Sequence, residues 1–423
     1  MNLPKNPPKN PPKNPPKNPP KNRRRTIPTI RRRSPVWAAE ANMKRALNAN
    51  MLYSIFDSAN MHRWNDHLRT VDLTELDKQA HKAAIAWILG KYEETAGGAS
   101  LDWTKVIEHT LFSFIQRLAM TDLKPQVFHR ITSEKMDEVN KYVLSYFDEN
   151  IPDADPRFRK RLETYFMSEK ASKEDAVIRA AHYFATRWEF DTIYDVNRLM
   201  YGIEQTRAEI YEQLFQHRDL VGVRTLLENK SAFNFVDLIG QLRFQQRWAR
   251  TPRVPRTTVL GHSLIVADMI FLNDLDRGAD DRQVYNNFYT ALFHDLPEVL
   301  TKDVISPVKQ NVGGLADLLE SYERELVGSK IMPLIPESWR GELEYMVHEP
   351  FSDFDDGRGR RTGRDIKACD LMAAYMEAHV SICHGISSRT LVEGETELKE
   401  RLWKTGDGIG ARLLLEDFDR LRI

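Results

Sequence analysis

The sequence has little of what would place the protein in a membrane or outside the cell. Its 423 residues include only two cysteines, Cys369 and Cys383, in what reads as one helix, so no disulfide framework is expected. No run approaches the roughly eighteen uncharged apolar residues that a membrane span needs. The start of the chain lacks the apolar segment of a secretory signal. We therefore expect a cytoplasmic protein without a membrane span.

A net charge is also absent, because 61 basic residues balance 61 acidic ones. This balance hides an asymmetry, since residues 1–33 contain five Lys and six Arg but no acidic residue. The rest of the chain is therefore mildly acidic, which argues against nucleic-acid binding through its bulk charge. Apolar residues make up 41% of the chain and charged residues 29%, as in soluble globular proteins.

The basic segment is also repetitive. Residues 1–22 repeat Pro-Pro-Lys-Asn, and "RRRTIPTIRRR" follows. Such frequent proline removes backbone hydrogen bonds, and nothing in the segment could form a core. The composition predicts a disordered basic tail over residues 1–35. Two interpretations remain open: a tail that contacts nucleic acid or acidic lipid, and a solvated extension without an essential role.

Beyond the tail, the periodicity is that of helices. Apolar residues recur at i, i+3, i+4 and i+7 in segments such as "DKQAHKAAIAWILGKY", "DWTKVIEHTLFSFIQRLA" and "TTVLGHSLIVADMIFLNDL", which is typical of amphipathic helices. No stretch alternates with a period of two for long enough to indicate a sheet. Residues 353–364, "DFDDGRGRRTGR", are predicted to be a mobile surface loop. The predicted fold class is all-α.

Three of the predicted helices in the C-terminal half place ionisable residues on or beside an apolar face. His294 and Asp295 end one helix, and His262 shares a face with Val259, Val266 and Met269. Asp370 shares a face with Ile366, Ala373 and Glu377. Two imidazoles and two carboxylates suit a divalent first-row metal with open positions for water and substrate. Taken alone, a histidine on an apolar face is more often a core residue than a ligand.

The order of these residues resembles the motif of the HD-domain metal-dependent phosphohydrolases, in which His, His-Asp and Asp lie on successive helices. The segments "QQRWARTPRVPRTTVLGHSLIVA", "HDLPEVLTKDVISPVK" and "KACD" are most similar to the bacterial HD-type 5′-deoxynucleotidases. The resemblance covers roughly residues 240–385. It implies that His262, His294, Asp295 and Asp370 hold the metal.

The same resemblance assigns further roles. Glu298 matches the catalytic carboxylate, which would exchange a proton with the attacking water or the leaving oxygen. Arg247 and Trp248 match a pair that lines the substrate pocket, Asp303 matches a residue near the sugar, and Lys309 would contact phosphate. The alternatives are structural: surface charges for Arg247 and Lys309, a core residue for Trp248, a turn for Glu298 and a helix cap for Asp303.

The histidine content favours a mononuclear site. Between Asp295 and Asp370 the only other histidine is His348, whereas dinuclear members of the family need additional histidines there. The implied cofactor is one divalent transition metal such as Mn²⁺ or Co²⁺. The signatures of three other HD subfamilies are absent: the Glu-Asp pair of ppGpp hydrolases, the GYP of cyclic-dinucleotide hydrolases and the Gly-His of dGTPases.

The N-terminal half contains a weak internal repeat of the same pattern. "IRAAHYFATRWE" at 178–189 aligns without gaps on "IKACDLMAAYME" at 366–377, and an Arg-Trp pair precedes a histidine in both halves. If the halves are duplicates, the counterparts of the four ligands are His81, Thr121, Asp122 and His182. This predicts a degenerate, non-catalytic copy that binds a regulatory nucleotide or packs on the catalytic domain. The alternative is chance similarity between short helices.

These inferences combine into one expectation. An N-terminal helical domain at 36–230, with the character of a degenerate HD repeat, precedes a catalytic HD domain at 235–423. The protein is expected to remove phosphate from nucleotides, with 5′-deoxynucleoside monophosphates as the favoured substrates. The alternatives are a deoxynucleoside triphosphate hydrolase regulated by the N-terminal domain, and a nucleotide-sensing or partner-binding module with an inactive site. The resemblance also implies a homo-oligomer.

Overall fold

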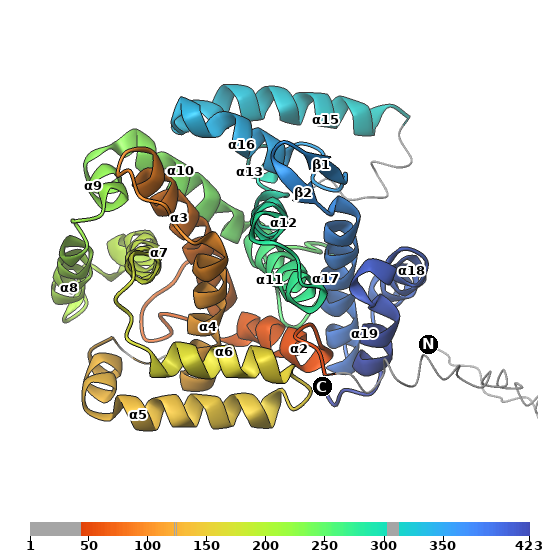
Figure 1. Cartoon of the computed structure of the whole chain (residues 1–423), viewed down its shortest axis with the longest axis horizontal. Coiled ribbons are helices and arrows are strands. Elements are labelled where there is room, and N and C mark those ends of the chain that lie inside the picture. The colour runs from red at the N-terminus through yellow and green to blue at the C-terminus, as the bar shows by residue number, and fades with distance from the viewer. Residues whose placement is uncertain (1–43, 122, 124, 303–312) are drawn as a thin grey trace, which may run out of the picture. The chain divides into compact units, whose positions relative to one another are not determined.

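The computed structural model describes residues 44–121, 123, 125–302 and 313–423. The predictions made for the tail, Asp122, Asp303 and Lys309 lie outside these residues. Within them, helices form all of the regular structure except one short hairpin (Figure 1). The all-α prediction is confirmed.

The N-terminal half of the described chain contains nine α-helices and a one-turn 3₁₀ helix, η1 (Ser58–Asn60). The nine are α2 (Ala49–Asp57), α3 (Glu75–Thr95), α4 (Trp103–Met120), α5 (Pro125–Asn150), α6 (Pro156–Met167), α7 (Lys173–Asn197), α8 (Ile203–Gln216), α9 (Val221–Glu228) and α10 (Lys230–Gln241).

The described C-terminal half continues with further helices and the hairpin. Its α-helices are α11 (Val259–Arg277), α12 (Asp281–Phe293), α13 (Glu298–Thr301), α15 (Leu315–Leu326), α16 (Glu337–Val347), α17 (Gly363–Cys383), α18 (Arg389–Thr405) and α19 (Ala411–Phe418). The short elements are η2 (Leu242–Phe244), η3 (Val327–Ile331), η4 (Met332–Leu334), η5 (Asp407–Ile409), β1 (Phe354–Asp356) and β2 (Gly359–Arg361).

Two long helices, α3 and α11, occupy the centre of this unit. Helix α3 packs against α7, α9 and α11, while α11 packs against α12 and α17 as well (Figure 1). Both are buried along nearly their whole length, as expected of helices with neighbours on several sides. The two central helices therefore bring the halves of the chain into direct contact.

The core is continuous between the halves. Trp87 of α3 is fully buried and its ring contacts Tyr289, Phe293 and Trp339. The Trp87 Nε1–H also donates a hydrogen bond of 2.8 Å to the hydroxyl of Tyr285. Lys44–Ile423 form one compact unit, and the domain boundary near residue 230 stays a prediction.

The segment predicted as a mobile surface loop, residues 353–364, contains an antiparallel hairpin instead. Phe354 pairs with Arg361, and Asp356 pairs with Gly359. The Arg361 side chain is buried, and its guanidinium donates to the carbonyls of Tyr345 and Glu349. An arginine that satisfies backbone carbonyls inside the protein has no hydrophobic periodicity, so the sequence pattern did not reveal it.

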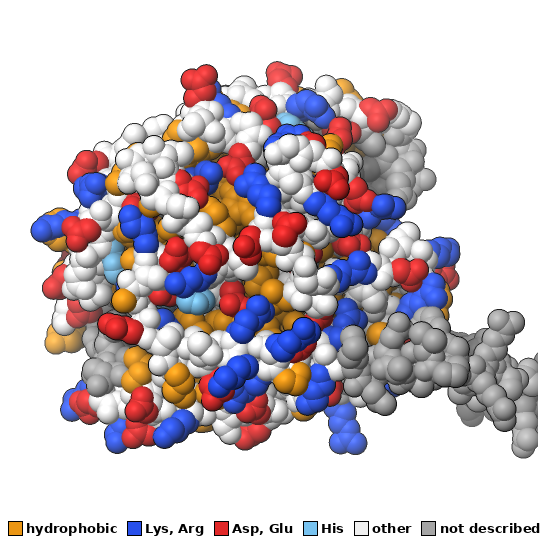
Figure 2. Space-filling model, in the orientation of Figure 1, with side chains coloured by type: hydrophobic (Ala, Val, Ile, Leu, Met, Phe, Trp, Pro, Cys, Tyr) orange, Lys and Arg blue, Asp and Glu red, His pale blue; other side chains and the backbone are white. Residues whose placement is uncertain are grey.

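Charges on the surface are mixed in sign. Figure 2 shows Lys and Arg side chains interspersed with Asp and Glu over the visible face. No described helix is both long and apolar enough to cross a membrane.

Candidate metal centre

Local capping sets the position of the first histidine. The Thr258 hydroxyl accepts a hydrogen bond of 3.1 Å from the Gly261 amide and caps α11. Such a cap satisfies one of the amides that a helix start leaves unpaired. His262 follows in the first turn and is fully buried. The cap therefore fixes the turn that carries His262.

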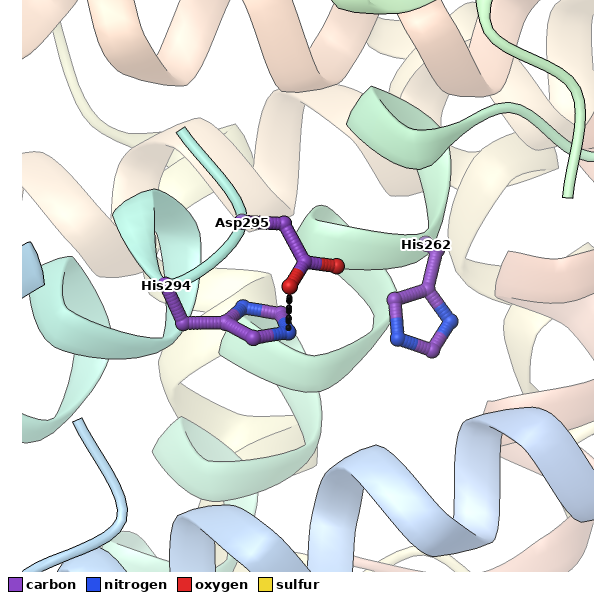
Figure 3. A group of neighbouring side chains, drawn as sticks. All are labelled: His262, His294 and Asp295. Atoms are coloured by element: carbon purple, nitrogen blue, oxygen red, sulfur yellow. Dashed lines mark ion pairs between the residues drawn. The ribbon is translucent and has the colours of Figure 1, made fainter. Parts of the chain in front are cut away.

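The His-Asp pair lies where α12 ends. His294 is the C-cap of α12 and is buried, whereas Asp295 is half-buried. Ligand atoms of His262, His294 and Asp295 lie within 4.8 Å of one another. Figure 3 shows the Asp295 carboxylate between the two imidazole rings. Helix α11 and the end of α12 thus bring three of the four predicted ligands together.

Hydrogen bonding fixes the tautomer of His294. Its Nδ1 lies 2.7 Å from the carbonyl oxygen of Ala291, which can only accept a hydrogen bond. Nδ1 therefore carries the hydrogen, and in the neutral ring Nε2 presents a lone pair. This Nε2 lies 3.2 Å from Asp295 Oδ1. Two lone-pair donors at this distance are complementary to a cation between them.

Asp370 joins the group through His262. Asp370 Oδ1 lies 3.0 Å from His262 Nε2, and its other oxygen accepts a hydrogen bond of 2.6 Å from Lys367. The three-residue cluster around Asp295 does not include Asp370. In an octahedral site with bonds of about 2.1 Å, adjacent ligand atoms are about 3 Å apart, so the His262–Asp370 separation suits two ligands of one ion.

Glu377 supports the centre from behind and was not among the residues predicted from the sequence. Its side chain is fully buried, and Oε1 lies 3.5 Å from His262 Nδ1. It also accepts hydrogen bonds from Trp248 Nε1 at 2.8 Å and from Thr257 Oγ1 at 2.6 Å. A carboxylate behind a metal-ligating histidine orients the ring and raises its basicity. The available signal was its position seven residues after Asp370 on a buried face.

The Arg-Trp pair contacts the same carboxylate. The Arg247 guanidinium lies 3.5 Å from Glu377 Oε2 and 3.8 Å from Asp295 Oδ2. The indole N–H of Trp248 is already donated to Glu377, and the far edge of its ring faces Gly394, where an added Cβ would lie 2.8 Å from it. Trp248 is therefore packed between the centre and α18, while Arg247 reaches toward the cluster.

Electrostatics keep the acids of the centre ionised. Burial opposes ionisation of Asp295, but His294 and Arg247 lower its pKa to about 2. Burial also acts against Asp370 and Glu377, yet Lys367 holds the pKa of Asp370, and Arg247 that of Glu377, well below the usual values. The buried centre therefore contains three carboxylates in the form that binds a cation.

The donor set fits a metal ion. His294 Nε2 and Asp295 Oδ2 are buried polar atoms without a hydrogen-bond partner among the described residues, and such atoms are costly to leave unsatisfied. Two imidazoles and two carboxylates are ligands that Mn²⁺, Fe²⁺, Co²⁺ and Zn²⁺ accept. The described residues thus include a His/Asp site able to hold a metal, whose identity they do not define.

The remaining predicted residues lie in different places. Glu298 is the first residue of α13, half-buried, and its amide donates to the Asp295 carbonyl at 3.0 Å. Gln245 Nε2 holds the Glu298 carbonyl at 2.9 Å. The turn thus ties Glu298 to the residue beside His294. Asp303 and Lys309 are not among the described residues.

Comparison with known proteins finds one matching family model and similar proteins. Residues 239–399 match the family model described as "HD domain". A 5′-deoxynucleotidase of Pectobacterium atrosepticum is 22% identical over 170 residues, which cover 39% of this chain and 80% of that protein. A crystal structure of an HD-domain phosphohydrolase from Listeria innocua has 18% identity and a TM-score of 0.37, and covers 44% of this chain and 85% of that one.

A helical bundle that gathers His, His-Asp and Asp from three helices, and that matches the HD family model, defines an HD domain. Residues 239–399 of this chain therefore contain an HD domain.

Proposed function

We propose that the protein is a metal-dependent hydrolase that removes phosphate from 5′-deoxynucleoside monophosphates. The observation that carries the proposal is the group formed by His262, His294 and Asp295, whose ligand atoms converge within 4.8 Å. The substrate class is supported by the similarity of residues in the HD domain to a protein named 5′-deoxynucleotidase.

His262, His294, Asp295 and Asp370 would hold one divalent metal, with Mn²⁺ or Co²⁺ as the favoured ions. When bound, such an ion supplies Lewis-acid activation of a water molecule and of the phosphoryl oxygen. His294 is already in the required tautomer because its Nδ1–H is donated to the Ala291 carbonyl. His294 therefore needs little reorganisation to bind a metal ion.

Glu298 would handle the proton. It lies one turn beyond His294, and its backbone is fixed by hydrogen bonds to Asp295 and Gln245. A carboxylate on the turn that follows the His294–Asp295 pair would accept a proton from the attacking water or return one to the leaving oxygen. Arg247 would oppose charge that develops on the phosphate, because its guanidinium reaches the edge of the cluster at Asp295. Trp248, Asp303 and Lys309 would line the substrate pocket.

The proposal is tested by loading the purified chain with Mn²⁺ or Co²⁺ and supplying deoxy- and ribonucleoside mono- and triphosphates. We expect inorganic phosphate from the deoxynucleoside monophosphates. Triphosphate released from a deoxynucleoside triphosphate would show the alternative hydrolase activity instead. Metal binding without turnover of any nucleotide would contradict a hydrolase and favour a sensing module.

Replacing Asp295 tests the site itself. In Asp295→Asn one anionic ligand is lost, so we expect kcat to fall at least 100-fold and the bound metal, measured by mass spectrometry, to fall with it. Asp281→Asn is the matched control, because Asp281 lies exposed at the other end of α12. Normal activity in the Asp295 variant would refute the assignment of the site.

A further inference from the structure

Residues 62–74 of the N-terminal half repeat the backbone contacts of residues 246–258, the segment that leads into the metal centre. The β-bridge between His62 and Thr74 has its counterpart between Gln246 and Thr258. The hydrogen bond from the Arg63 amide to Leu73 is repeated from the Arg247 amide to Thr257. Every partner differs in number by the same 184 positions. A common register over this segment is far more specific than helical resemblance.

Side chains follow the same register. Thr74 caps α3 as Thr258 caps α11. Trp64 has a positive φ of 53° and Trp248 one of 55°, a conformation that is rare for a tryptophan. The indole of Trp64 donates to Glu189 at 3.0 Å, just as that of Trp248 donates to Glu377. Both halves therefore contain an Arg-Trp pair held by a buried glutamate.

This register corrects one pairing made from the sequence. His81 was predicted to stand where His262 does, but the shared caps place Lys78 there instead. His81 lies almost one turn further along α3, where its Nε2 contacts the Val236 carbonyl at 2.9 Å and its ring packs on Trp188. His182 takes the position of Asp370, because α7 and α17 align through Glu189 and Glu377.

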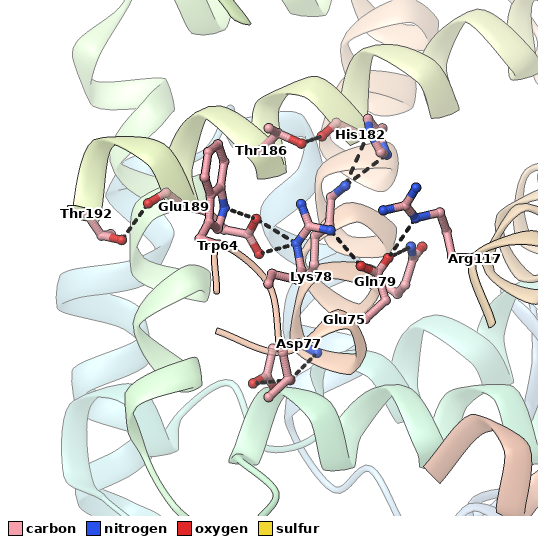
Figure 4. Close-up of polar contacts among 12 residues, drawn as sticks. Trp64, Glu75, Asp77, Lys78, Gln79, Arg117, His182, Thr186, Glu189 and Thr192 are labelled. Atoms are coloured by element: carbon pink, nitrogen blue, oxygen red, sulfur yellow. Dashed lines mark hydrogen bonds and ion pairs between the residues drawn. The ribbon is translucent and has the colours of Figure 1, made fainter. Parts of the chain in front are cut away.

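The N-terminal counterpart of the metal centre therefore contains a lysine, Lys78, at the position of His262. Lys78 Nζ lies 3.1 Å from His182 Nδ1, where the metal centre has the contact between His262 and Asp370 (Figure 4). At the end of α4, Thr121 is the C-cap, as His294 is the C-cap of α12. Lys78, His182 and Thr121 thus correspond to His262, Asp370 and His294 of the metal centre. An ammonium among these groups repels a divalent metal ion.

Two lysines are buried around this position, beside the buried acids Glu75 and Glu189 that pair with Arg63. Lys78 and Lys82 are both buried, and neither ammonium has a carboxylate within ion-pair distance among the described residues: Lys78 contacts His182, and Lys82 contacts Gln79 and Ser113. A buried charge without a counterion is costly. Burial lowers the pKa of Lys78 well below its usual value and that of Lys82 to about 7. An anion bound beside these lysines would stabilise their charged form.

Arg117 adds a third basic group on the open side, where its guanidinium also lies 3.6 Å from Glu75. Burial, followed by the charges of Lys78, Lys82 and Arg117, holds the pKa of His182 well below its usual value, so these groups surround the ring. Figure 4 shows the end of Lys78 at His182 and the guanidinium of Arg117 directed toward Glu75. His182 and Arg117 are half-buried, which leaves this side of the cluster in contact with solvent. A guanidinium and an ammonium together are a common recognition set for phosphate.

We propose that the N-terminal half contains a metal-free counterpart of the metal centre, which binds a phosphate oxyanion at Lys78, Arg117 and His182 without hydrolysing it. The Lys78 amine takes the place of the metal and would carry a positive charge when the anion is bound. The choice of phosphate among oxyanions rests on the proposed function, since the equivalent position of the other half would receive a nucleotide phosphate. The two buried lysines without a carboxylate partner do not depend on that function.

The test is phosphate binding to the full chain after removal of metal with a chelator. Titration calorimetry with inorganic phosphate at constant ionic strength is expected to show one site per chain. In Lys78→Met the dissociation constant should rise at least tenfold, while Lys91→Met, a control further along α3 where Lys91 pairs with Glu94 and Glu342, should bind as the wild type does. Equal binding by wild type and the Lys78 variant, or no binding by either, would overturn the proposal.

Two further arms make the result independent of a folding defect and of hydrolysis. If circular dichroism shows that the Lys78 variant is unfolded, Arg117→Gln takes its place with the same expected loss. Titration with dAMP distinguishes a site for free phosphate from a site for a nucleotide. An affinity equal to that for inorganic phosphate indicates recognition of phosphate alone, and at least tenfold tighter binding indicates a nucleotide site. A second equivalent of Mn²⁺ that persists in Asp295→Asn and is lost in His182→Gln would refute a metal-free site. Absence of nucleotidase activity would leave these binding results standing.

Discussion

At the scale of single residues, Glu377 shows how a buried acid outside the ligand set controls the centre. It contacts His262, Arg247, Trp248 and Thr257 at once. Glu377→Gln removes the negative charge behind His262 and leaves Arg247 with one acidic partner fewer. Because groups behind a ligand typically contribute about 10–100-fold in metal affinity, we expect the dissociation constant for Mn²⁺ to rise by about that factor.

A positioning role for Glu377 has a distinct signature. Glu377→Asp should recover part of the metal affinity, and saturating Mn²⁺ should recover part of the activity of Glu377→Gln. Glu393→Gln, an exposed glutamate on α18, is the control and should bind Mn²⁺ normally. Metal affinity unchanged in Glu377→Gln would show that this carboxylate is only a structural anchor for Trp248.

Asp268 predicts a pH dependence of stability that is separate from the metal centre. It lies fully buried on α11, and one of its oxygens has no hydrogen-bond partner among the described residues. Burial raises its pKa to about 8, against the opposing effect of Lys82. Between its ordinary pKa near 4 and pH 8 the folded chain holds a proton that the unfolded chain has lost. This group therefore makes the protein less stable as the pH rises through that window.

Replacing Asp268 with asparagine should remove this contribution. The expected slope is at most about 1.4 kcal/mol per pH unit. Urea unfolding at pH 5, 6 and 7 should give a steeper loss of unfolding free energy for the wild type than for Asp268→Asn. The range stops at pH 7 because Lys82, with its pKa lowered to about 7, acts in the opposite direction above that value. Identical slopes would show that Asp268 does not titrate in this range.

At the scale of elements, the start of α11 connects both halves with the metal centre. The Thr258 hydroxyl caps α11 and donates to Asp77 Oδ1 at 2.5 Å, and Asp77 also accepts from Thr74, the cap of α3. Thr258→Ala removes the cap and one bond between the helices, so we expect a loss of about 1–2 kcal/mol in unfolding free energy by urea titration. Thr258→Ser keeps the hydroxyl and should stay within about 0.5 kcal/mol of the wild type. An unaffected alanine variant would show that the α3–α11 packing alone holds the turn.

The contrast between Thr258 and Glu377 shows what a sequence can reveal. Helix periodicity is local, so the all-α fold and the helices around His262 and His294 were predictable. Glu377 meets Trp248 across 129 positions, and no local pattern encodes that contact. The repeat was visible as an Arg-Trp pair in each half, but spacing along the chain suggested His81. Only the β-bridge and the helix cap that both halves share identify Lys78 as the counterpart of His262. The loop between the Arg-Trp pair and the cap has no periodicity from which this register could be predicted.

At the scale of the whole molecule, the two halves share one core, which predicts that they unfold together. Trp87 of the N-terminal half packs on Phe293 of the C-terminal half, the residue directly before His294. Trp87→Ala leaves a large cavity at this junction, and such truncations cost about 3–5 kcal/mol. We expect a single urea transition at lower concentration, with weaker Mn²⁺ binding because the end of α12 loses its support.

Trp403 provides the matched control for this truncation, since its side chain is 45% exposed whereas that of Trp87 is fully buried. Trp403→Ala should change the unfolding free energy by no more than about 0.5 kcal/mol. Circular dichroism and Mn²⁺ release followed in the same titration should then coincide for wild type and for Trp87→Ala, because the metal centre and the N-terminal core lose their structure in one step. Two separate transitions, with metal retained after the first, would instead show that the halves are independent domains and that the boundary near residue 230 is also a folding boundary.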